Sequence, residues 1–195
     1  MNTPLLTPRS AREQSTFRRL LEALARPGTL HAIAPHDEGG PFAAAVTVLE
    51  ALLDHEVSFA TSPANPEVEE ALLRLTGSHT ASVGEADYVL AWGAGVAAAI
   101  DAAKTGVPEY PDRGATVIAA VESISGPAGP GHRLRLRGPG IRDSATIAVR
   151  GFGPEAVEAF ARRNATLPCG LDVVLVTSEG VAAGLGRYTR ITEGS

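Results

Sequence analysis

Residues Gly93–Ala98 read GAGVAA, a G-x-G-x-x-A pattern that follows the apolar segment 88–92 and precedes an expected helix. In a strand-turn-helix context, such glycines let a pyrophosphate approach the N-terminus of the helix. The fingerprint is incomplete, because no acidic residue ends a following strand at the usual spacing of about 20 residues. A plain strand-to-helix turn is the favoured interpretation, and a nucleotide site at Gly93–Ala98 is the alternative.

Lysine chemistry has a single candidate, because Lys104 is the only lysine among 17 basic residues. Lys104-Thr105 does not complete a phosphate-binding P-loop, since Ala98 and Ala103 stand where that motif needs glycine. Toward the end of an expected helix, a solvated lysine is favoured by the helix dipole. We therefore expect neither a Schiff base nor a pyridoxal phosphate site.

The side chains that bind metals or act as nucleophiles are scattered along the sequence. The histidines show no H-x-x-x-H or H-x-H spacing, and Phe59 stands where a second ligand would follow His55-Glu56. Cys169 is the only cysteine, and a buried inert thiol is its simpler interpretation. We predict no catalytic residue, no cofactor and no metal, although a metal site assembled in three dimensions stays open. The histidines are His31, His36, His55, His79 and His132.

A basic stripe is predicted in the segment HRLRLR, which alternates strictly between polar and apolar residues. As a strand, it would place Leu134 and Leu136 on one face and Arg133, Arg135 and Arg137 on the other. These three arginines are the candidate contacts for an anion or an acidic partner. A solvent-exposed strand face is the commoner explanation of such a stripe.

The elements that must position these residues alternate between short apolar strands and helices, as in a layered α/β domain. Phe17, Leu20, Leu21 and Leu24 have the spacing of one buried helix face. Consecutive strands separated by Gly/Pro turns in the second half imply a hairpin or meander, so the sheet is predicted to be mixed. Helices are expected at residues 16–25, 41–54, 66–75, 96–104 and 154–163, strands at 29–33, 57–60, 88–92, 115–121, 132–137, 145–149 and 171–177, and a short terminal segment at 180–195.

The chain as a whole has 195 residues, 44% of them hydrophobic and 20% charged, which predicts one globular domain. We expect residues 1–12 to be a flexible N-terminal segment and residues 13–195 to form the domain. The net charge of -5 disfavours nucleic acid as a partner. No apolar stretch approaches the roughly 20 residues of a membrane span, and the polar start lacks a signal-peptide core. A cytoplasmic location is therefore predicted.

Three stretches resemble the PhnH family, which supplies one component of the bacterial carbon-phosphorus lyase core complex. TFRRLLEALARPGT at residues 16–29 is similar to the opening signature of that family, and residues 105–141 are similar to its middle. LPCGLDVVLVT at residues 167–177 is similar to its strand signature, with Asp172 in register. The resemblance extends over roughly residues 12–192. It departs at Leu167, where the family has an aromatic residue, and at Cys169, where it has an apolar one.

This resemblance implies an α/β/α layered fold with a mixed sheet, like a truncated large domain of the pyridoxal-phosphate-dependent transferases without the cofactor. It also implies a homodimer in isolation, which joins subunits G, I and J as a non-catalytic or accessory subunit. That assembly forms α-D-ribose 1-methylphosphonate 5-triphosphate from ATP and methylphosphonate. Two rival interpretations stay open: a small nucleotide-binding transferase that uses Gly93–Ala98, and a module that binds phosphonate or phosphate through Arg133, Arg135 and Arg137.

Overall fold

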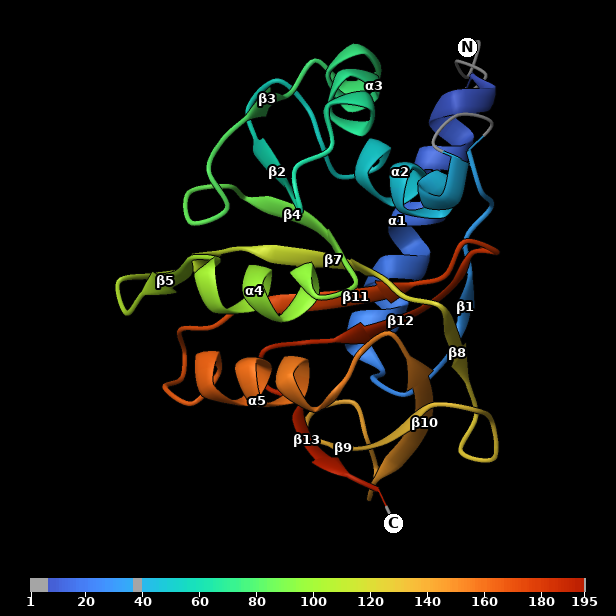
Figure 1. Cartoon of the computed structure of the whole chain (residues 1–195), viewed down its shortest axis with the longest axis vertical. Helices are drawn as coiled ribbons and strands as arrows, with labels where there is room; N and C mark the ends of the chain where they lie inside the picture. The colour runs from blue at the N-terminus through green and yellow to red at the C-terminus, as the bar shows by residue number, and fades with distance from the viewer. Residues whose placement is uncertain (1–6, 37–39, 195) are drawn as a thin grey trace, which may run out of the picture.

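A seven-stranded mixed sheet forms the centre of the part of the chain that the structure describes, residues 7–36 and 40–194 (Figure 1). The structure is a computed structural model. The strand order is β1-β12-β11-β7-β4-β2-β3. The strands are β1 (His31–Ala32), β2 (Ser58–Ser62), β3 (His79–Thr80), β4 (Tyr88–Trp92), β7 (Thr116–Ala120), β11 (Asp172–Val176) and β12 (Val181–Leu185).

The sheet is mixed, as predicted, but for a different reason. β3, β2, β4, β7 and β11 run parallel, and β12 pairs with β11 in the antiparallel direction. The antiparallel strand β12 therefore lies inside the expected terminal segment 180–195, and it forms a hairpin with β11. The residues VAAGL of β12 include few β-branched side chains, so no strand was expected there.

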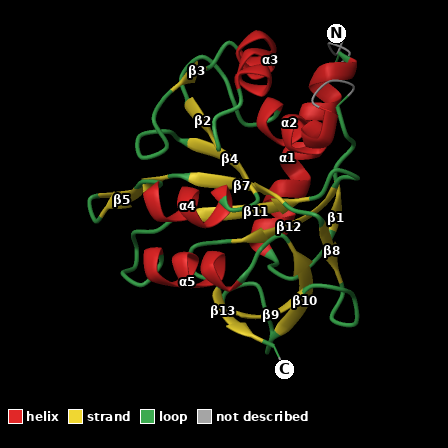
Figure 2. Cartoon of the chain, viewed as in Figure 1, coloured by secondary structure: helices red, strands yellow, loops and turns green. Residues whose placement is uncertain are grey.

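Helices cover both faces of this sheet (Figure 2). Because successive strand residues point to opposite faces, Ile118 and Val174 pack with α1, α2 and α3, whereas Val117 and Val173 pack with α4 and α5. The expected α/β/α layering is confirmed over the described residues. The helices are α1 (Pro8–Ala25), α2 (Ala43–Glu50), α3 (Pro66–Thr76), α4 (Gly95–Ala102) and α5 (Pro154–Arg163), with a 3-10 turn at Gly40–Phe42 before α2.

A second, smaller antiparallel sheet lies beside the central one, with the strand order β13-β9-β10-β8. It contains the hairpin that we expected in the main sheet, because Leu134, Leu136 and Ile147 pack on the α5 side of the core. Its strands are β8 (Ser123–Ser125), β9 (His132–Arg137), β10 (Ala145–Arg150) and β13 (Arg190–Glu193); a separate hairpin joins β5 (Thr105–Val107) to β6 (Tyr110–Gly114).

The first helix is longer than predicted. Thr7 caps it by accepting a hydrogen bond from the Ser10 backbone, and Pro8 occupies its first turn, which are two standard start signals. Residues 8–12 of the expected flexible segment are therefore helical, and residues 1–6 lie outside the described residues.

The predicted buried face of α1 is also partly wrong. Leu20 is buried, but 45% of Phe17 and 54% of Leu21 are exposed. The buried side of the helix is instead formed by Thr16, Leu20 and Ala23. None of the described helices combines the length and the apolar character needed to cross a membrane.

Candidate functional site

The parallel strands change their direction of winding between β2 and β4. From β2 the chain passes through α3 to the edge strand β3, whereas from β4 it passes through α4 to β7 on the other side. The two helices also lie on opposite faces of the sheet. In open α/β sheets, the loops at such a switch point diverge and leave a crevice outside the carboxyl ends of the strands, where ligands usually bind. We therefore take the region outside the carboxyl ends of β2 and β4 as the candidate site.

Two adjoining hollows lie outside these strand ends. The first, of about 530 Å³, is lined by the residues that follow β2, Ser62 and Pro63, and by the turn from Trp92 into α4. The second, of about 610 Å³, shares Gly93 and Ala94 with the first. Its other lining residues are Gly131, His132, Arg150, Gly151, Gly153 and Glu155.

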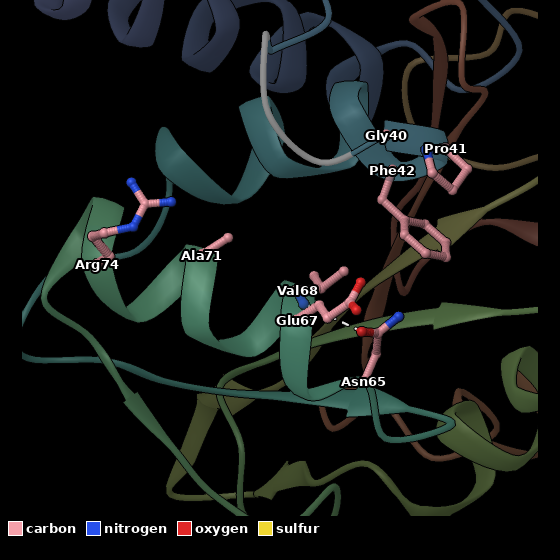
Figure 3. A pocket seen from close by; sticks show the side chains of 8 residues that line it. All are labelled: Gly40, Pro41, Phe42, Asn65, Glu67, Val68, Ala71 and Arg74. Carbon is pink, nitrogen blue, oxygen red and sulfur yellow. Dashed lines mark hydrogen bonds between the residues drawn. The ribbon is translucent and has the colours of Figure 1, made fainter.

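A third pocket, of about 410 Å³, lies between α3 and the turn before α2 (Figure 3). The ring of Phe42 lines it and contacts Trp92, with the ring centroids 4.6 Å apart. Asn65, at the start of α3, accepts a hydrogen bond from the backbone of Val68 at 3.2 Å through its side-chain oxygen. Trp92 thus stands between this pocket and the first of the two hollows.

The local backbone structure explains why glycines occupy the turn after β4. Gly93 adopts a φ of +54°, which strains any residue with a Cβ. A Cβ at Gly95 would lie 2.3 Å from the carbonyl oxygen of Ser62, so α4 can pack against the end of β2 only with glycine there. The pattern therefore fits the favoured prediction of a strand-to-helix turn.

Lys104 lies near the amino-terminal end of β4, whereas the hollows lie at the carboxyl ends of the strands. α4 ends at Ala102, so Lys104 is not in the helix, and its Nζ contacts Asp87 Oδ1 at 2.5 Å and the Glu85 carbonyl oxygen at 2.9 Å. The expectation of a solvated lysine at the helix end is therefore wrong. Burial raises the pKa of Asp87, but hydrogen bonds from Lys104 and Ser58 lower it by more, and the pKa lies below its usual value.

The histidines and the cysteine are distributed over separate parts of the fold. His36 Nε2 lies 3.7 Å from the buried carboxylate of Glu50, which also pairs with Arg9 and Arg12. His132 lines the switch-point hollow, and Cys169 is half-buried before β11. Within residues 7–36 and 40–194, no three His, Cys, Asp or Glu side chains come together as a possible metal site.

The predicted arginine stripe is confirmed as an exposed strand face. Arg133, Arg135 and Arg137 are exposed on β9, while Leu134 and Leu136 are buried. The same face gains a further exposed arginine, Arg190 of β13, which pairs in register with Arg137. We call these four arginines the arginine face. It lies on the small sheet.

The comparison with known proteins decides the family. The model of the bacterial phosphonate metabolism protein PhnH matches residues 6–192 of this chain. The chain belongs to the PhnH family. It is 35% identical over 180 residues to a protein of Stutzerimonas stutzeri named as a putative C-P lyase subunit protein, HtxG, covering 92% of this chain and 86% of that protein.

A second relative has a more explicit name. It is the alpha-D-ribose 1-methylphosphonate 5-triphosphate synthase subunit PhnH of Rhizobium meliloti (strain 1021), 31% identical over 185 residues, which cover 91% of this chain and 89% of the relative. The resemblance stated from the sequence is confirmed, and these relatives support a role in phosphonate metabolism.

The three stretches that carry the PhnH resemblance meet around one small pocket of about 310 Å³. Leu24 and Pro27 line it from the first stretch, Pro139 from the second and Asp172 from the third. Arg187, which sequence reasoning missed, donates to Asp172 Oδ2 at 2.7 Å and also to the Pro111 carbonyl. A lone carboxylate at the start of the apolar strand β11 was the signal for such a partner, and the pair ties the start of β11 to the segment after β12.

Proposed function

We propose that this PhnH-family chain is an accessory, non-catalytic subunit of the carbon-phosphorus lyase core complex, and that it joins subunits G, I and J. The name of the Rhizobium relative supports this proposal, as does the match over about nine-tenths of both chains. The assembly would form α-D-ribose 1-methylphosphonate 5-triphosphate from ATP and methylphosphonate during organic phosphonate catabolism.

The observation that carries the docking role is the apolar side of α1. Phe17 and Leu21 are one helical turn apart, and about half of each side chain is exposed. Leu24, one turn further, is half-buried and lines the pocket where the family stretches meet. We call Phe17, Leu21 and Leu24 the α1 strip. Adjacent apolar side chains left in water are a mark of an interaction surface.

The arginine face is a second proposed contact. The chain carries a net charge of -5, yet this sheet face gathers four arginines. Arg137 and Arg190 are directly paired across β9 and β13, and like charges at such positions destabilise a sheet. An acidic partner surface would offset that repulsion and direct association. Arg133, Arg135 and Arg137 thus keep their proposed role as partner or anion contacts.

The finer expectations belong to the same proposal. The isolated chain would form a homodimer, in which one surface patch meets its own copy across a two-fold axis. Its layers would correspond to a shortened large domain of the pyridoxal-phosphate-dependent transferases that binds no cofactor. The protein would work in the cytoplasm.

Co-purification tests this function. The tagged chain is co-expressed with subunits G, I and J, purified on the tag, and sized by sedimentation. We expect all four chains to elute in fixed proportions as one species. A tagged chain that elutes without any of the other three would contradict the proposal.

The rival function, a nucleotide-binding transferase at Gly93–Ala98, is separated by calorimetry with ATP. A Gly95→Val variant is a poor probe, because the side chain would meet Ser62 and disturb packing. Ala98→Glu is better, since Ala98 is exposed on α4 and lines the hollow. Micromolar ATP binding that Ala98→Glu abolishes would favour the rival.

A further inference from the structure

We propose that the switch-point crevice binds a sugar that carries a phosphate or phosphonate group, with Arg150 and His132 as the contacts of the anionic group. The anion contacts are inferred from the structure alone. The choice of a sugar ligand rests on the proposed function, in which a ribose phosphonate is handled.

The location follows from the fold. The two hollows at the carboxyl ends of β2 and β4 meet at Gly93 and Ala94, where the winding of the sheet reverses. The crevice outside the carboxyl ends of the strands is the usual ligand position in open α/β sheets. The small sheet extends it, because the start of β9 and the end of β10 bring His132 and Arg150 to the second hollow.

The charge of the ligand follows from Arg150 and His132. Both residues are exposed, and within the described parts of the chain neither side chain has a hydrogen-bond or ion-pair partner. Lys104 and Arg187, by contrast, are engaged in ion pairs. Arginine binds the oxygens of phosphate or phosphonate through paired donors, and histidine supplies another donor.

The remaining walls restrict what else the ligand carries. Gly131, Gly151 and Gly153 line the second hollow without side chains, which leaves the backbone open to a ligand. Glu155 lines the same hollow and would repel a second anionic group, but it can accept hydrogen bonds from hydroxyls. Pro63 and Trp92 line the first hollow and offer an apolar wall. One anionic group attached to a hydroxyl-bearing ring fits this arrangement.

Calorimetry of the purified full chain tests the site, with ribose 5-phosphate, ribose, methylphosphonate and inorganic phosphate as probes. We expect ribose 5-phosphate to bind more tightly than either inorganic phosphate or ribose. Arg150→Ala should weaken binding of every phosphorus-bearing probe by about tenfold, the effect of losing a charge-assisted contact. Glu155→Gln should tighten the binding of inorganic phosphate and weaken the preference for the sugar phosphate over inorganic phosphate.

The matched control is Arg142→Ala, which removes an exposed arginine of the β9–β10 loop that lines neither hollow. It should leave all affinities unchanged. The proposal is overturned if no probe binds up to about 10 mM, or if Arg150→Ala binds like the wild type. Co-purification of Arg150→Ala with subunits G, I and J is measured in parallel, so loss of the anion site is distinguished from failure of the docking function.

Discussion

Asp87 connects three segments at the amino-terminal ends of β2 and β4, opposite the crevice. Its Oδ2 accepts hydrogen bonds from the backbone and hydroxyl of Ser58 at 2.8 and 2.7 Å, and its Oδ1 pairs with Lys104. Asp87 itself precedes β4. The carboxylate therefore holds the starts of β2 and β4 to the segment after α4, and the folded state favours its ionised form.

Asp87→Asn should remove a pH-dependent part of the stability. Because the pKa of Asp87 is lower in the folded protein than the unfolded value of 3.8, its ionised form stabilises the fold above that value. That contribution declines as the pH falls below 3.8 toward the folded pKa. The wild type should thus exceed the variant in free energy of unfolding at about pH 7, and the difference should shrink at about pH 3 in urea titrations.

Lys104→Gln provides the control for Asp87, because it removes one donor to the carboxylate and leaves the Ser58 bonds in place. Its stability should depend less on pH than that of the wild type across the same acidic range. Parallel loss of stability by the wild type and Asp87→Asn on acidification would show that the Asp87 carboxylate is not responsible.

Single residues differ in how far the sequence reveals them. The alternation of HRLRLR was enough to predict that Leu134 is buried and Arg135 exposed, because strand periodicity is local. The pairing of Glu50 with Arg12 was not predictable, since the two residues are 38 positions apart. Periodicity contains no information about which distant segment a helix will meet.

The same limit applies to elements, and α1 shows it most clearly. The wide apolar stripe of this helix was visible in the sequence. The sequence did not show which side of the stripe faces the core. Ala23 is fully buried, and a Cβ at Gly184 of β12 would lie 2.6 Å from its carbonyl oxygen. The close approach of two small residues turns Phe17 and Leu21 outward, and neither small residue carries a sequence signal of that contact.

Gly184→Val should therefore push α1 away from the sheet. Added side-chain atoms in a packed contact usually cost about 1–3 kcal/mol, and here they would meet backbone that cannot rotate aside. Urea unfolding followed by circular dichroism should show a lower midpoint with an unchanged slope. Gly126→Ala is the control, because nothing lies within 4 Å of the Cβ that alanine would add, and its midpoint should stay within error of the wild type.

At the scale of the whole molecule, the α/β class could be predicted from the sequence but the crevice could not. Strand and helix order along the chain can be deduced from local patterns, whereas the order of strands in the sheet depends on long-range pairing such as that of β11 with β7. The switch point between β2 and β4 exists only in that spatial order. Arg150 was consequently not singled out, although it lines the crevice together with the Gly93 turn.

The α1 strip should govern assembly without contributing to the stability of the free chain. Phe17→Glu and Leu21→Glu place carboxylates at positions whose native side chains are 45% and 54% exposed, so thermal unfolding of the isolated protein should change little. In a complex the same carboxylates would be buried without partners, and the double variant should co-purify with subunits G, I and J at least tenfold less efficiently, as roughly 1.4 kcal/mol of lost affinity requires. Leu73→Glu, on the exposed side of α3, is the matched control and should assemble normally. Normal assembly of the double variant would exclude α1 as the docking surface, because an interface formed for apolar side chains cannot bury two carboxylates without loss of affinity.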